Sequence, residues 1–162
     1  MGLIQRQLQM ADVIWNYKVG EVKREMDNNL KLKVLMLNSN EISGIKKTWE
    51  NSFVPIETNK EKIHIDCMLW HIFSYNVREC EEGEDAINSF KAVLKDSVYI
   101  FYQRIDIGYK IDNSIRAFTF DDLSQFITDF ETADIYITDK GFNWTFVKTH
   151  EDGLLGPYFC KR

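Results

Sequence analysis

The chain is short of the residues that mark disulfide frameworks, tight turns and phosphate-binding loops. Of its 162 residues, only 3 are cysteine, 2 are proline and 8 are glycine. The cysteines are too few and too widely spaced for a secreted disulfide scaffold, so we expect free thiols and a cytoplasmic location. The glycines form neither a phosphate-binding loop nor a dinucleotide-binding pattern, and we expect no cofactor.

Long apolar runs and an excess of positive charge are also missing. The longest uninterrupted apolar runs are Val34–Leu37 and Val98–Tyr102, far too short to span a membrane. Acidic residues outnumber basic ones by 25 to 20, which gives a net charge of −5. A chain without basic clusters lacks the charge that draws nucleic acids and anionic membranes. We therefore expect neither of these as a partner.

Aromatic residues, in contrast, are plentiful. The chain has 11 Phe, 7 Tyr and 4 Trp, and such large apolar rings favour burial and argue against disorder. The length suits one domain, since domains commonly hold about 150 residues. We expect a single domain over residues 1–162, made of an N-terminal helix at 1–28 and an α+β core at 32–162.

Residues 3–28 have the spacing of an amphipathic helix. Their apolar positions, from Ile4 to Met26, recur every three or four residues and share one helical face. We expect this face to dock onto the chain's own domain. A homodimer formed through this helix is the alternative, because a stripe of this length is at the lower limit for a coiled coil.

Within the core, apolar runs at 33–37 and 98–103 predict a buried strand and a central strand. Helical spacing follows three start signals, which are the polar residues 38–40, the acidic run 81–85 and Thr119. We therefore expect a helix after each of these signals.

Toward the C-terminus, residues 134–138 and 143–149 alternate around a glycine-containing turn and predict a hairpin. Residues 104–118 fit either a strand or a covering loop, and the tail from Gly153 is expected to be irregular. Together these elements predict an α+β fold. We expect a mixed sheet of about five strands that ends in an antiparallel hairpin and is packed by about four helices, including the N-terminal one.

A histidine and cysteine pattern lies in the segment 63–75. His64, Cys67 and His71 have the spacing H-x2-C-x3-H, and both residue types bind zinc. The segment alternates, however, and predicts a strand with its core at 69–75, on which His64 would point away from the other two side chains. We therefore favour a half-buried strand with a packed cysteine over a metal site.

A second candidate site combines residues that are distant in the sequence. His71 and His150 each lie in or just after a predicted strand, and Glu151 follows directly. If the strand ends converge, these three side chains could form a metal or acid–base cluster. In the structural alternative, the acidic residues after His150 cap the hairpin and His71 donates a hydrogen bond within the core.

The predicted hairpin is apolar on both faces. Trp144 and Phe146 share one face, and Tyr136 belongs to the other. Large exposed apolar patches are uncommon, so we expect the N-terminal helix or the tail to cover this hairpin. The alternative is that it presents a surface to a partner.

Several segments together resemble a known family. They are LWHIFSY at 69–75, EGEDA at 82–86, YIFYQ at 99–103, DIYI at 134–137, NWTFVKTHE at 143–151 and GPYF at 156–159. This order of segments resembles the domain-of-unknown-function family 4275, a family of small uncharacterised bacterial proteins. The resemblance implies a bacterial, cytoplasmic setting but no activity. It places Trp70, Trp144 and Tyr158 in these segments beside the candidate histidines.

We expect a non-catalytic binding or interaction module, of the immunity or regulatory kind, whose partner is another protein. Trp70, Trp144 and Tyr158 are its candidate binding residues. The alternative is a small metal-dependent or acid–base enzyme that uses His71, His150 and Glu151.

Overall fold

The computed structural model describes residues 33–112, 133–151 and 153–162. Two expectations lie outside these residues: the N-terminal helix at 1–28, with the homodimer that it would support, and the helix after Thr119. The division into a helix and a core, and the single domain, therefore stay predictions.

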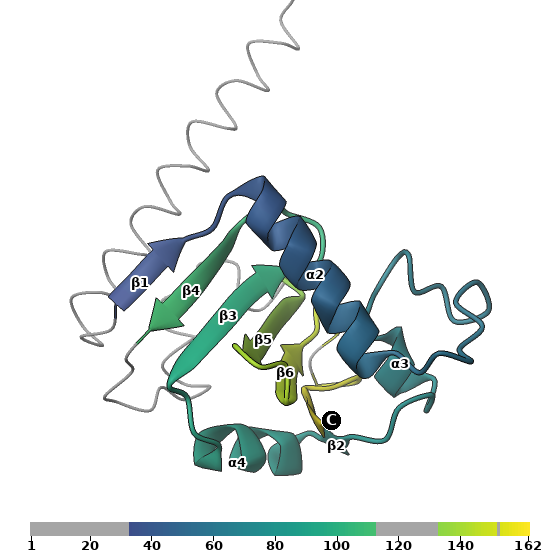
Figure 1. The fold of residues 1–162 in the computed structure, drawn as a ribbon. Coiled ribbons are helices and arrows are strands. Elements are labelled where there is room, and N and C mark those ends of the chain that lie inside the picture. Colours follow the sequence, from purple (N-terminus) through teal and green to yellow (C-terminus); the bar gives the residue numbers. More distant parts are fainter. Residues whose placement is uncertain (1–32, 113–132, 152) are drawn as a thin grey trace, which may run out of the picture.

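Seven strands form one sheet in the order β1-β4-β3-β5-β6-β7-β2 (Figure 1). They are β1 (Lys33–Met36), β2 (Glu81–Glu82), β3 (Ser97–Tyr102), β4 (Gly108–Asp112), β5 (Ile135–Asp139), β6 (Trp144–Lys148) and β7 (Tyr158–Lys161). The described helices are α2 (Ser39–Phe53), α3 (His71–Ser74) and α4 (Glu84–Ala92). The α+β class is thus confirmed.

Every strand pair in this sheet is antiparallel, so the expected mixed sheet is wrong. The prediction treated each helix between two strands as a crossover that joins parallel neighbours. In the structure, α2 and α4 each follow a strand at an outer edge of the sheet, and the next strand along the chain is not its neighbour. Alternation of helices and strands therefore does not fix strand direction.

Helix α2 begins as the sequence predicts. The Asn38 side chain accepts a hydrogen bond from the Glu41 backbone N–H at 2.9 Å, and the Glu41 carboxylate accepts one from the Asn38 N–H at 2.8 Å. This reciprocal pair satisfies two backbone donors that a helix start leaves unpaired. Ile42, Trp49 and Phe53 are buried on one face of the helix.

The central strand β3 and the hairpin of β5 and β6 are confirmed as well. The Asp139 carboxylate fixes the hairpin turn by accepting hydrogen bonds from the backbone N–H groups of Asn143 and Trp144, at 2.6 and 3.0 Å. The ambiguous segment 104–118 contains strand β4, which pairs with β3.

Two strand predictions need correction at the sheet edges. The strand at 33–37 exists as β1, but it is an edge strand with only Val34 buried, because only β4 flanks it. The tail was expected to be irregular, yet residues 158–161 form β7 between β6 and β2. Three apolar residues of this short strand, Tyr158, Phe159 and Cys160, are buried, which explains why it pairs.

The predicted strand at 63–75 is wrong. The chain forms turns up to residue 70 and then the short helix α3. His64 has a positive φ of 54°, a left-handed conformation that interrupts an extended strand. The buried side chains of this segment also depart from strict alternation; they are Ile63, Ile65, Met68, Trp70, Ile72 and Phe73.

The sheet buries a core on each face, and α2 and α4 belong to different ones. Phe90 of α4 stacks on Phe146 with ring centroids 4.3 Å apart, whereas Trp49 of α2 donates to the Thr145 hydroxyl at 2.8 Å on the opposite face. The aromatic hairpin is thus covered on both sides. Among the described residues, α2 and α4 supply this cover, and the tail contributes Phe159 beside Trp144, while the expected cover by the N-terminal helix lies outside these residues. Within the described ranges, no helix is long and apolar enough to cross a membrane.

Candidate functional site

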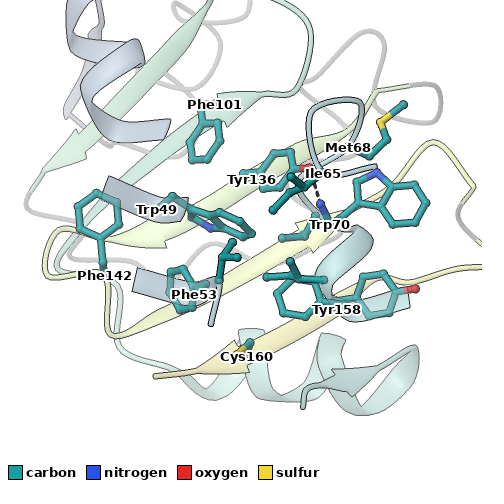
Figure 2. Close-up of a cluster of buried hydrophobic side chains, with 14 of the residues drawn as sticks. Trp49, Phe53, Ile65, Met68, Trp70, Phe101, Tyr136, Phe142, Tyr158 and Cys160 are labelled. Carbon is teal, nitrogen blue, oxygen red and sulfur yellow. Dashed lines mark hydrogen bonds between the residues drawn. The ribbon is translucent and has the colours of Figure 1, made fainter. Parts of the chain in front are cut away.

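Four of the residues singled out from the sequence gather around the buried indole of a fifth, Trp70. The Trp70 ring lies at the start of α3, and its centroid is 4.7 Å from that of His71, 6.0 Å from that of His150 and 6.4 Å from that of Tyr158. Glu151 follows His150 in the chain. We call this group the Trp70 cluster: Trp70, His71, His150, Glu151, Tyr158 and, as shown next, Asp134. Figure 2 shows Trp70 and Tyr158 among the buried side chains of this face.

A buried carboxylate ties the cluster together. The Asp134 side chain is only 6% exposed. It accepts hydrogen bonds from the Trp70 indole N–H at 3.0 Å, the His150 backbone N–H at 2.9 Å and the His150 Nδ1–H at 2.9 Å. Three donors compensate the loss of water around a buried carboxylate. Asp134 therefore fixes both the indole and the imidazole in place.

The bond to Asp134 determines which nitrogen of His150 faces outward. An ionised carboxylate only accepts hydrogen bonds, so Nδ1 carries a proton and Nε2 is the remaining acceptor of the neutral ring. The His150 side chain is 36% exposed, and its Nε2 lies 3.8 Å from a carboxylate oxygen of Glu151, which is 43% exposed. This pair can exchange hydrogen bonds or a proton with a molecule at the surface.

His71, which also contacts the indole, is held in a similar way. Its Nδ1 lies 2.7 Å from the Ile63 carbonyl oxygen, which only accepts, so Nδ1 donates here too. Its ring contacts Tyr75 with centroids 5.3 Å apart, and Tyr75 is 50% exposed. The expected internal hydrogen bond of His71 is thus present, but it comes from a turn and a short helix rather than from a strand.

A buried polar network fixes the backbone of the cluster at Trp70. The Tyr136 hydroxyl accepts a hydrogen bond from the Trp70 backbone N–H at 3.1 Å, drawn in Figure 2, and donates to the Gln103 side-chain oxygen. The same oxygen accepts from the Leu69 N–H at 3.0 Å. Burial, together with the nearby charge of Asp134, raises the pKa of Tyr136 well above its ordinary value, so the hydroxyl stays protonated.

Trp144 does not join the other candidate binding residues. It lies in the core on the α4 face, with its ring centroid 6.1 Å from that of Phe90 and 5.9 Å from that of Phe159. Trp70 and Tyr158 belong to the opposite face. Neighbouring positions on a strand point to opposite faces, so an aromatic-rich hairpin distributes its rings to both cores.

The histidine and cysteine pattern does not assemble into a ligand set. His64 has the left-handed backbone described above, Cys67 is exposed, and His71 is turned toward the Ile63 carbonyl. In the described part of the chain, no three His, Cys, Asp or Glu side chains are grouped so that they could hold a metal ion.

Sequence reasoning missed Asp134, Gln103 and Tyr136. A signal for Asp134 existed in the hairpin, where Ile135 pairs with Lys148. Continuing this register by one residue places Asp134 opposite Thr149, the residue before His150. No comparable local signal existed for Gln103, because its partner Leu69 is 34 residues away along the chain.

The family model described as Domain of unknown function (DUF4275) matches residues 21–159, and the chain belongs to this family. The resemblance found from the sequence segments is therefore confirmed, and every residue of the Trp70 cluster lies within the match. The search of curated proteins and the search of solved structures gave no match. Family membership adds no activity to this site.

Proposed function

We propose that the chain is a non-catalytic binding module of a bacterial cytoplasm that recognises another protein through the rim of the Trp70 cluster. The rim consists of His71, Tyr75, His150 and Glu151. The observation that carries this proposal is the contrast between a rim with exposed polar and aromatic groups and a base, Trp70 and Asp134, that is buried and hydrogen-bonded.

The physical case rests on preorganisation. Both imidazoles are fixed through Nδ1 before any partner arrives, by Asp134 and by the Ile63 carbonyl. Groups that are already ordered lose less conformational entropy on association, so more of the contact energy appears as affinity. A half-exposed tyrosine at the edge adds a large contact area with a polar tip, which is typical of interface hot spots.

The test compares two single variants of the full chain. Tyr75→Ala removes the exposed ring of the rim, and Leu94→Ala, at a position 76% exposed beyond the end of α4, is the matched control. A protein recovered with the wild-type chain is purified, and its Kd is measured by calorimetry. We expect Tyr75→Ala to weaken binding about 30-fold or more, the loss of a hot spot, and Leu94→Ala to leave the Kd unchanged.

Equal affinity for both variants, or a loss confined to Leu94→Ala, would place the interface elsewhere and contradict the proposal. Glu151→Gln refines the result, because it removes one rim charge and keeps the shape. It should slow association and reduce the salt dependence of binding.

One observation favours a second candidate, an acid–base enzyme. Asp134 holds Nδ1 of His150 and leaves Nε2 exposed beside Glu151, the arrangement that a general base requires. A panel of ester, amide and phosphoester substrates tests it. An activity that falls about 10²–10⁴-fold in His150→Gln would establish the enzyme. A metal-dependent form would need His71, His150 and Glu151 on one ion, which metal analysis of the purified protein tests directly.

A further inference from the structure

Two cysteines lie opposite each other at the edge of the sheet formed by β2 and β7. These strands are antiparallel, with Glu81 opposite Phe159 and Glu82 opposite Tyr158. Continuing this register by one residue places Cys80 opposite Cys160. Directly opposed residues in antiparallel strands have Cα atoms about 4.5–5.5 Å apart, which lies within the roughly 4.4–6.8 Å that disulfides span.

Both thiols also lie on the same side of the sheet. Cys160 belongs to the core on the α2 face, and Cys80 packs against that same core. Both are free thiols, Cys160 buried and Cys80 partly exposed. They line one open cleft of about 460 Å³. A small reagent can therefore reach Cys80 first, with Cys160 behind it.

The electrostatic surroundings of Cys80 agree with this proximity. Burial is the largest of the causes that together raise the pKa of the Cys80 thiol to about 12. The charge that Cys160 would carry also raises this pKa, as do the carboxylates of Glu82, Glu79 and Glu81. Around Cys160, burial raises the pKa and the neighbouring Arg78 guanidinium opposes this rise. Because the thiolate is the reactive form, oxidation at this site is slow at pH 7 and accelerates as the pH rises.

We propose that Cys80 and Cys160 form a reversible disulfide, a covalent site that joins the edge strand β2 to β7 when the chain meets a small disulfide oxidant such as glutathione disulfide. The Cys80 thiolate attacks one sulfur of the oxidant, and a mixed disulfide forms as one glutathione leaves. The Cys160 thiolate then attacks the Cys80 sulfur and releases the second glutathione. Two protein thiols are oxidised, and one glutathione disulfide is reduced to two glutathiones.

Strand β7 connects this disulfide to the candidate site. Tyr158, which packs on Trp70, lies two residues before Cys160 in β7, and β2 follows the segment that leads away from Tyr75. In an oxidised chain, the segment before β2 is therefore joined covalently to the strand that carries Tyr158. This inference does not depend on the binding function proposed above.

The test uses the full chain with Cys67→Ser, which leaves Cys80 and Cys160 as its only thiols. The folded protein is incubated with glutathione disulfide from pH 7 to pH 9, free thiols are blocked, and intact mass and peptide mapping identify the products. We expect the Cys80–Cys160 link to exceed the glutathione adduct by roughly tenfold or more, because the second thiol is held in place. The oxidation rate should rise about tenfold per pH unit.

Two further variants locate each step. Adding Cys160→Ala should stop the reaction at a glutathione adduct on Cys80, and adding Cys80→Ala should leave the buried Cys160 unmodified. The oxidised parent should also melt roughly 5–15 °C higher than the reduced form, since the link closes a long loop. A persistent Cys80 adduct in the parent, or a link that forms only after unfolding in denaturant, would overturn the proposal.

Discussion

The two faces of the sheet differ in how they use buried polar groups. On the α4 face, rings and aliphatic side chains fill most of the core, with Phe90 stacked on Phe146, although this core also contains Tyr102, Tyr109 and Trp144. On the α2 face, a core of similar size also contains the Tyr136 hydroxyl and the Trp70 indole N–H, each hydrogen-bonded. Apolar packing is tolerant of rearrangement, whereas a satisfied buried network specifies one arrangement. The candidate site lies on the α2 face, where the buried network fixes the positions of the side chains.

The largest expected effect comes from breaking the apolar face. Phe90→Ala removes a fully buried ring that contacts Trp144 and Phe146. We expect the free energy of unfolding to fall by about 3–5 kcal/mol, the transfer term plus the cavity left behind. Urea denaturation measures it, with the exposed Leu94→Ala as control, expected within about 0.5 kcal/mol of wild type. A loss below about 1 kcal/mol would mean that α4 does not close this core.

A smaller effect is expected from breaking the polar network. Tyr136→Phe keeps the ring but removes the hydroxyl. The Trp70 backbone N–H then loses its acceptor, and the Gln103 side-chain oxygen loses one of its donors. We expect the free energy of unfolding of Tyr136→Phe, measured by urea denaturation, to fall by about 1–3 kcal/mol, the cost of an unsatisfied buried polar group. Tyr75→Phe is the matched control, since the half-exposed Tyr75 can leave its hydroxyl to water.

The affinity for the proposed partner protein should also distinguish the two faces of the sheet. Tyr136→Phe should also weaken binding, because the rim loses its fixed base, whereas Phe90→Ala should leave the affinity of the remaining folded chain close to wild type. Calorimetry on both variants separates these outcomes. If both variants bind equally well, the network is structural only.

The smallest effect concerns Lys95, a buried lysine that borders the core on the α4 face. Burial lowers the pKa of Lys95 from 10.5 to about 8, and its ammonium lies 4.5 Å from the centroid of the Phe90 ring. Between these pH values the unfolded chain binds the proton more tightly, so the folded state gains stability as the pH rises. Relative to Lys95→Met, the wild type should gain on the order of 1 kcal/mol from pH 8 to pH 10. An unchanged difference across this range would mean that Lys95 is not desolvated.

Elements that rest on neighbouring residues were predictable. The Asn38 cap and Glu41 lie three residues apart and define the start of α2, and Asp139 closes the turn of the hairpin within five residues. The hairpin register in turn places Asp134 opposite Thr149, beside His150. This half of the Trp70 cluster was therefore accessible from the sequence, although only His150 was identified.

The other half was not accessible in this way. Trp70 meets Asp134 across 64 positions of the chain and Tyr136 across 66. Residues 63–75 alternate like a strand, and only their burial against α2 and β5 folds them into turns and α3. The spacing of residues within this segment cannot show whether it forms a strand or turns and a helix, because contacts with distant segments decide between them.

By itself, the order of the amino acids determined the class of the fold, the hairpin, the capped helix and the family, because each follows from interactions or patterns within short stretches of chain. Strand direction, the role of β7 as an inner strand and the meeting of Trp70, His71 and His150 arose only when those stretches packed together. Burial of apolar surface stabilises contacts between residues whatever their separation in the sequence. These features therefore had no local signature.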